Sequence, residues 1–125
     1  MASERFERGL AVRREVLGAE YVNRSLAEAD DFSRPLQELV TEYCWGEIWT
    51  QPELPKKTRS LINIGMISAL NRPHELKLHI RGALRNGATK DEIRAVLMQV
   101  AIYCGVPAAI DGLRVAREVL KEEGV

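Results

Sequence analysis

Cysteine and histidine are scarce in this sequence of 125 residues, which holds two of each. Cys44 and Cys104 lie far apart and fit no metal-binding or redox spacing, a pattern typical of buried thiols in a reducing compartment. Two histidines without a supporting cluster of ligands also argue against a metal site. The sequence contains neither a phosphate-binding glycine loop nor a serine nucleophile elbow. Any enzyme activity is therefore expected to need no metal ion and no nucleotide.

An excess of charge of one sign is also absent, because 18 basic residues balance 18 acidic ones. The surface as a whole then has no electrostatic reason to bind nucleic acid or an anionic membrane. The longest apolar run, residues 61–70, is about half of the roughly 20 residues that a membrane span needs. The charged start MASERFERGL is unlike a signal peptide. We expect a soluble, cytoplasmic protein with no nucleic-acid or membrane partner.

Apolar residues and helix-boundary signals, in contrast, are abundant. Apolar residues make up 46% of the chain, enough for a single core, and no segment has the pattern of a strand. Ser3 is placed to cap a first helix, and Thr89 with Glu92 forms a capping box for a later one. We predict an all-α helical bundle with one domain over residues 1–125 and a looser segment over residues 19–32. The six predicted helices cover residues 4–17, 33–49, 56–70, 74–87, 89 to about 104, and about 107 onward.

Two of the predicted helices carry more apolar surface than one small core can cover. The helix over residues 56–70 is apolar nearly all round after its basic first turn, which predicts burial on more than one side. The helix over residues 89–104 has one apolar face and further apolar residues on its other faces. That face holds Ile93, Val96, Leu97 and Val100, and the further residues are Met98, Ala101 and Ile102. Such surplus is most readily buried against copies of the same chain, so we expect a homo-oligomer.

The segment EYCWGEIWTQPELPKKTRSL, residues 42–61, contains both tryptophans of the chain with Glu47 between them. Two interpretations of Glu47 are open. Trp45 and Trp49 can exclude water from its carboxyl and favour the protonated form, which suits proton transfer. Alternatively, Glu47 forms a salt bridge at the end of a helix. The tryptophans themselves are most often part of a core.

Arg59 and His79 are two further candidates. Arg59 lies in the first turn of a helix, where the helix dipole does not favour a cation, so two interpretations are open: Arg59 holds an anion or carboxylate as a binding residue, or it pairs with a structural partner such as Glu47. His79 borders the apolar face of its helix, where a histidine usually packs its ring and bonds a backbone carbonyl. Arg81 and Arg85 on the same helix, with a glycine beside the ring, favour a functional role for His79 instead.

Several segments together resemble the carboxymuconolactone decarboxylase family of the alkylhydroperoxidase-like superfamily. They are WGEIW, the P-x-L-P-x-x-TRSL connector, ELKLHIRGALRNGATKDEI and YCGVPAA, and the early GLAVRREVLG and YVNRSL extend the likeness to nearly the whole chain. The resemblance implies an all-helical subunit, commonly assembled into hexamers, with a cofactor-free active site. It also implies decarboxylation of 4-carboxymuconolactone to the β-ketoadipate enol-lactone in the breakdown of protocatechuate.

The resemblance also implies roles for particular residues. The substrate is a lactone with two carboxylates, so the site needs cations for them, a donor for the charge that develops on the lactone oxygen, and an acid for the ring carbon. An apolar wall around the leaving carboxylate favours its loss of charge. We predict that His79 and Glu47 are catalytic, with Glu47 orienting or protonating His79. The predicted substrate-binding residues are Arg59, Trp45, Trp49, Arg81 and Tyr103.

The same superfamily contains alkylhydroperoxidases, which carry a C-x-x-C pair before the shared histidine. Counting back from His79, the two cysteine positions hold Arg72 and Glu75, and the position of the accompanying glutamate holds Ser60. Without a thiolate there is no peroxide nucleophile and no disulfide to cycle, which argues against a hydroperoxidase. Two alternatives stay open. One is a relative acting on another lactone or ring carboxylic acid, and the other is a non-catalytic helical oligomer.

Overall fold

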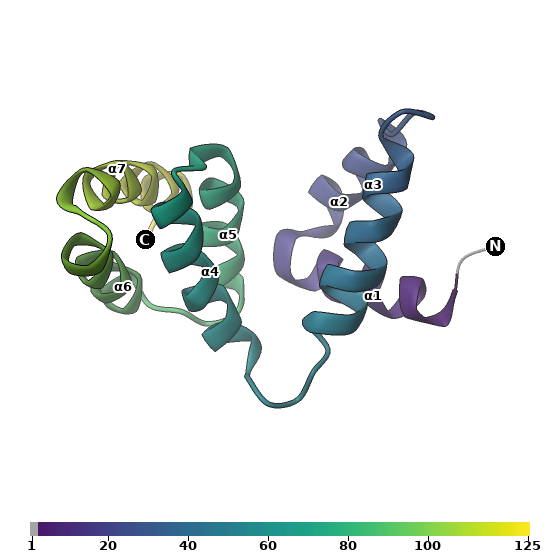
Figure 1. Cartoon of the computed structure of the whole chain (residues 1–125), viewed down its shortest axis with the longest axis horizontal. Coiled ribbons are helices and arrows are strands. Elements are labelled where there is room, and N and C mark those ends of the chain that lie inside the picture. Colours follow the sequence, from purple (N-terminus) through teal and green to yellow (C-terminus); the bar gives the residue numbers. More distant parts are fainter. Residues whose placement is uncertain (1–2) are drawn as a thin grey trace. The chain divides into compact units, whose positions relative to one another are not determined.

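The computed structural model describes residues 3–125, and over this range the chain forms helices and no strand (Figure 1). The prediction of an all-α fold is therefore confirmed. The chain divides into two compact units, an N-terminal unit that ends at Pro55 and a C-terminal unit that begins at Lys56. No helix within residues 3–125 has the length and apolar character needed to cross a bilayer.

The N-terminal unit contains α1 (Glu4–Leu17), α2 (Ala19–Ala27), α3 (Arg34–Leu39) and the π-helix η1 (Val40–Ile48). The first helix has the predicted bounds, and its predicted cap is confirmed because Ser3 Oγ accepts a hydrogen bond of 3.0 Å from the backbone N–H of Phe6. The prediction of a looser segment from residue 19 is wrong, since α2 occupies its first part. Gly18, at φ 93°, adopts the left-handed conformation that lets α2 begin directly after α1.

The predicted helix over residues 33–49 begins where expected but changes its hydrogen bonding at Val40. Its last turn shows the π pattern directly, because the N–H of Trp49 donates to the carbonyl of Cys44, five residues back, at 3.0 Å. The hydroxyl of buried Thr41 donates to the carbonyl of Gln37 at 2.7 Å, at the point where the bonding changes. Side-chain bonds of this kind compete with the backbone ladder of a helix.

Two glycines bring α1 and η1 into backbone contact. A Cβ atom at Gly9 would lie 1.9 Å from the carbonyl oxygen of Thr41, and one at Gly46 would lie 2.4 Å from that of Arg5. Side chains of any size would force the two helices apart at this crossing. The N-terminal unit therefore depends on glycine at positions 9 and 46, where the helices approach more closely than packed side chains allow.

The C-terminal unit contains α4 (Lys56–Leu70), α5 (Pro73–Arg85), α6 (Lys90–Tyr103) and α7 (Val106–Glu122). These bounds agree with the predicted helices to within about three residues, a scatter typical of helix ends. The capping box of α6 is confirmed by two hydrogen bonds. The N–H of Glu92 donates to Thr89 Oγ1 at 3.1 Å, and the N–H of Thr89 donates to a Glu92 carboxylate oxygen at 2.9 Å.

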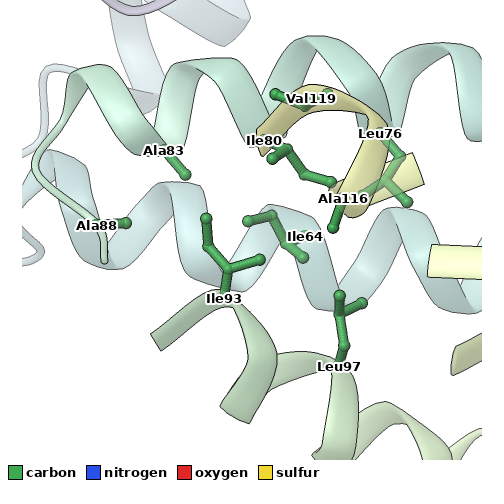
Figure 2. Packing of buried hydrophobic residues seen from close by; sticks show 9 residues of the cluster. All are labelled: Ile64, Leu76, Ile80, Ala83, Ala88, Ile93, Leu97, Ala116 and Val119. Carbon is green, nitrogen blue, oxygen red and sulfur yellow. The ribbon is translucent and has the colours of Figure 1, made fainter. Parts of the chain in front are cut away.

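The core of the C-terminal unit is aliphatic and draws on all four of its helices (Figure 2). Its buried residues are Ile64, Leu76, Ile80, Ala83, Ala88, Ile93, Leu97, Ala116 and Val119. Burying each large aliphatic side chain among them contributes roughly 1.5–3 kcal/mol. The predicted apolar face beside His79 belongs to this core, since Leu76, Ile80 and Ala83 are all buried.

Other apolar residues of α4 and α6 are exposed, although burial on more than one side of α4 was predicted. On α4 the buried positions are Ser60, Ile64 and Ser68, on one side of the helix only. Six large residues face solvent, namely Ile62, Met66 and Leu70 on α4 and Met98, Ile102 and Tyr103 on α6. The surplus apolar surface therefore exists as predicted, and its burial against another copy of the chain stays a prediction.

Candidate functional site

The two tryptophans of η1 stack on each other. Their ring centroids are 4.7 Å apart with an interplanar angle of 24°, and both side chains are buried. A stacked pair of this kind contributes about 0.5–1.5 kcal/mol beyond the burial of its area. Trp45 and Trp49 are thus part of the packing, as an ordinary interpretation of the sequence expects. Their predicted place in substrate binding stays a prediction.

Glu47 is not enclosed by the tryptophans, contrary to the first of the two sequence-based interpretations. Its side chain is 48% exposed, and its carboxylate lies 3.8 Å from Nη1 of Arg5. The other terminal nitrogen of Arg5 lies 3.5 Å from the carboxylate of Glu42. The guanidinium also covers the ring of Tyr43, with 4.6 Å between its central carbon and the ring centroid. The second interpretation, a salt bridge at a helix end, is confirmed, and its partner is Arg5.

Sequence reasoning missed Arg5, Glu42 and Tyr43 as neighbours of Glu47. The signal was hidden because Glu42 and Glu47 are five residues apart, a spacing that places two side chains on different sides of an α-helix. Only the π-helix brings them to one side. No local sequence pattern distinguishes this segment from an ordinary α-helix.

Arg59 lies in the first turn of α4, as predicted, and is half-buried. The same turn holds Lys57, whose ammonium lies 3.0 Å from the carboxylate of Glu92. Asn86 supports the start of the helix through a hydrogen bond of 2.9 Å from its amide to Ser60 Oγ. The amino end of α4 therefore combines basic side chains with the positive end of the helix dipole, and both attract carboxylates.

His79 lies on α5 at the edge of the aliphatic core, as predicted, and its Nδ1 atom is buried. Burial lowers the pKa of His79 below the ordinary value of 6.5, and the carboxylate of Glu75, one turn away, partly opposes this shift. The imidazole is consequently neutral at pH 7. In that form it carries one N–H donor and one acceptor nitrogen.

Arg81 joins α5 to the end of α7. Its guanidinium forms ion pairs with Glu122 and, at 3.5 Å, with Glu123, while Lys77 pairs with Glu118 and Glu122 at 2.9 and 3.2 Å. The hydrogen bonds from Arg81 and Lys77 lower the pKa of Glu122. The predicted role of Arg81 in substrate binding stays a prediction.

Tyr103 lines an apolar groove of about 480 Å³ between α4 and α6. Its lining residues include Thr58 of α4 and Cys104 at the end of α6, and neither Arg59 nor His79 is among them. The side chain of Tyr103 is 82% exposed. Tyr103 therefore does not share this groove with Arg59 or His79. Its predicted role in substrate binding stays a prediction.

The two cysteines differ in their surroundings, although both were predicted to be buried. Cys44 is partly buried, and this burial raises the pKa of its thiol, with the charge of Arg13 opposing the shift. Cys104 is exposed, which corrects the prediction for that residue. Within residues 3–125, no group of three or more His, Cys, Asp or Glu side chains is arranged to hold a metal ion.

Comparisons with known proteins place these residues in a family. The pattern of the carboxymuconolactone decarboxylase family matches residues 34–118, a range that contains every predicted site residue. A 4-carboxymuconolactone decarboxylase of Acinetobacter baylyi is 42% identical over 122 residues, covering 98% of this chain and 91% of the relative. A nitrosuccinic acid decarboxylase of Metarhizium robertsii is 44% identical over 117 residues, covering 94% of this chain and 82% of the relative.

Both relatives are named as decarboxylases, and the match to each extends through both compact units. The family pattern covers more than half of the chain, and it begins at the first residue of α3 and ends within α7. The resemblance seen in the sequence is thereby confirmed: the chain belongs to the carboxymuconolactone decarboxylase family.

Proposed function

We propose that this protein is a cofactor-independent decarboxylase of 4-carboxymuconolactone, which it converts to the β-ketoadipate enol-lactone in protocatechuate breakdown. The observation that carries the proposal is the identity of 42% over 98% of the chain to a protein named for that activity. The half-buried Arg59 at a helix start and the neutral His79 at the core edge add chemical support.

The proposed reaction needs no electron sink outside the substrate. The ring carbon of 4-carboxymuconolactone carries the leaving carboxylate, an acetate arm, the ring oxygen and an alkene conjugated to the lactone carbonyl. When the bond to the carboxylate breaks, its electron pair moves through the alkene onto the carbonyl oxygen, giving a dienolate and CO₂. A proton then adds to the ring carbon next to the carbonyl. The protein has to bind the carboxylates, stabilise the oxyanion and deliver the proton.

Three residues are assigned to these tasks. Arg59 binds a substrate carboxylate through its planar fork of donors. His79 donates its N–H to the oxygen on which negative charge develops, a role that suits an imidazole kept neutral by burial. Glu47 relays the proton, because its half-exposed carboxylate takes a proton from water and passes it to the ring carbon next to the carbonyl.

A second candidate substrate is nitrosuccinic acid, favoured by the identity of 44% over 94% of the chain to the decarboxylase named for it. Nitrosuccinate and 4-carboxymuconolactone share one arrangement. In each, a single carbon carries the leaving carboxylate, a CH₂–COO⁻ arm and a group that can accept an electron pair. The acceptor is the nitro group in one and the conjugated lactone in the other. The same assignment of Arg59 to the retained carboxylate and His79 to the developing oxyanion serves both.

The test measures CO₂ release from freshly prepared 4-carboxymuconolactone and from nitrosuccinate by the purified chain. Preference for one of the two, expressed as kcat/KM, identifies the substrate, and turnover of neither contradicts the proposed function. Arg59→Lys keeps the charge but loses the fork, so KM should rise while kcat changes less.

His79 is tested with two substitutions that separate donation from proton transfer. His79→Ala should lower kcat by something like 10²–10⁴-fold, since it removes the donor altogether. His79→Gln retains an N–H donor and should keep part of that activity, whereas a role in proton transfer would be lost equally in both variants. Circular dichroism of each variant establishes that it is folded. A folded His79→Ala protein with near-normal kcat would return His79 to the role of a packed core-edge residue.

We further propose that the chain assembles as a homo-oligomer, with a hexamer as the specific expectation from the family resemblance. The exposed apolar residues of α4 and α6 support it. Light scattering should give a mass several times that of the 14.1 kDa chain. Ile102→Lys, which places a charge on the 81% exposed Ile102, should reduce that mass. Val125→Lys is the control, because Val125 is an exposed apolar residue outside these two helices. A parent chain found only as a 14.1 kDa species contradicts the proposal.

A further inference from the structure

Arg5 holds three side chains of one face of η1 together. Its guanidinium lies 3.5 Å from the carboxylate of Glu42 and 3.8 Å from that of Glu47, and it covers the ring of Tyr43 at 4.6 Å. The carboxylates approach different terminal nitrogens, Nη2 for Glu42 and Nη1 for Glu47. The flat face of the same group is engaged by the aromatic ring. The guanidinium of Arg5 thus contacts three side chains of η1, while 37% of the Arg5 side chain is exposed.

The π-helix is the reason why one arginine can reach both carboxylates. In a π-helix a carbonyl pairs with the N–H five residues later, so residues 42 and 47 lie one above the other along the axis. In an α-helix the corresponding neighbours are three and four residues apart, and Glu47 would then face away from Glu42. The change in hydrogen bonding at Val40 thus turns Glu47 towards Arg5.

The backbone of Arg5 is held as firmly as its side chain. A Cβ atom at Gly46 would lie 2.4 Å from the carbonyl oxygen of Arg5 and 3.0 Å from its Cγ. The main chains of α1 and η1 are therefore in contact at this point, next to Glu47 in the sequence. Because the backbone of Arg5 is already held, less conformational entropy is lost when its guanidinium pairs with the Glu47 carboxylate. The pair therefore restricts that carboxylate more than a pair with a mobile surface arginine would.

From this geometry we infer that Arg5 is a positioning residue for Glu47, and that the π-helix and the glycine contact with α1 exist at this site to set the orientation of the Glu47 carboxylate. The inference rests on the proposed function, in which Glu47 carries a proton. Arg5 acts through Glu47 and does not itself bind substrate. Its removal should therefore lower kcat and leave KM nearly unchanged.

The test is a double-mutant cycle between Arg5→Gln and Glu47→Gln, measured as kcat on whichever of the two substrates the parent chain turns over. Arg5→Gln alone should lower kcat by roughly threefold to thirtyfold, which lies within the range for coupled residues in direct contact. In the Glu47→Gln background the same substitution should have no further effect. Arg5→Lys, which keeps the charge, should recover part of the loss.

Arg8→Gln is the matched control. Arg8 is also an arginine of α1 that reaches η1, with its Nε 3.4 Å from the carbonyl oxygen of Gly46, but it makes no ion pair with Glu47 among the described contacts. This variant carries the same change of charge and should keep the kcat of the parent. Urea unfolding of both variants separates a loss of activity from a loss of stability.

The outcomes separate this inference from the proposed function. If Arg5→Gln lowers kcat by the same factor in the parent chain and in the Glu47→Gln variant, the inference is overturned while the decarboxylase assignment stands. The same holds if Glu47→Gln leaves kcat unchanged, or if Arg8→Gln lowers kcat as much as Arg5→Gln. A parent chain that releases CO₂ from neither substrate overturns the proposed function itself.

Discussion

The two compact units of this chain reach stability by different means. The C-terminal unit packs regular α-helices around aliphatic side chains such as Ile64, Ile80 and Leu97. The N-terminal unit relies on a backbone contact at Gly9, stacked tryptophans and a π-helix. An aliphatic core tolerates change in proportion to the volume altered. A backbone contact has no such latitude, because the first added carbon atom already collides.

The largest expected effect comes from breaking that backbone contact. Gly9→Ala would place a Cβ atom 1.9 Å from the carbonyl oxygen of Thr41, a backbone atom of η1. We expect a loss of stability of about 3 kcal/mol or more, at the upper end for overpacking. The measurement is urea unfolding followed by tryptophan fluorescence, which reports the N-terminal unit because it holds both tryptophans.

Gly65→Ala is the matched control for that variant in the C-terminal unit. A Cβ atom at Gly65 would lie 3.6 Å from a methyl group of Val96, an ordinary contact distance. Alanine in the middle of α4 should therefore be accepted and raise stability by roughly 0.5–1 kcal/mol. Far-ultraviolet circular dichroism, which follows the helices of both units, compares the unfolding of the two variants, and similar midpoints would contradict the contrast between the units.

In the aliphatic core, unlike at the backbone contact, the loss of stability should grow with the side-chain volume that a substitution removes. Ile80 is fully buried among residues of the neighbouring helices (Figure 2). Ile80→Val should cost about 0.5–1.5 kcal/mol and Ile80→Ala about 2–5 kcal/mol, in step with the volume removed. Urea unfolding followed by far-ultraviolet circular dichroism measures both. If the two substitutions lower the free energy of unfolding equally, the loss at position 80 does not depend on the volume removed, and the core then behaves like the backbone contact at Gly9.

The same contrast explains which parts of the fold were predictable. The bounds of α4, the capping box at Thr89 and the place of His79 at the core edge all follow from local patterns, and the structure confirms them. The π-helix does not follow, because helix propensities do not distinguish π from α hydrogen bonding, and its close contact with α1 joins Gly9 to Thr41, about 30 positions away in the sequence. The helix over Ala19–Ala27 was missed for a weaker reason, since it lacks a side-chain cap at its start.

The candidate site divides along the same line. Residues on regular helices, Arg59 and His79, lie where the sequence predicts, at a helix start and at the edge of a core. For Glu47 the kind of interaction was predicted but not the partner, because the side of the helix on which Glu47 lies depends on π rather than α hydrogen bonding. Residues whose neighbours are set by long-range contacts require the structure.

The smallest expected effect concerns the protonation of His79, which is a test of how tightly the edge of the regular core is packed. Burial lowers the folded-state pKa of His79 below 6.5, so between that lowered value and 6.5 the unfolded chain binds more protons than the folded chain. Stability from the neutral ring is thus fully present above about pH 6.5 and is lost as the pH falls towards the folded-state pKa. His79→Gln removes the titrating group, so the free energy of unfolding should fall less steeply on acidification from pH 7 to pH 5 than in the parent chain.

His74→Gln is the control, because His74 lies on the same helix but is exposed. The comparison is made by urea unfolding at several pH values across this window. Identical pH dependence in the parent and in His79→Gln would mean that water reaches the ring freely, and the assignment of a neutral, desolvated donor to position 79 would then lose its physical basis.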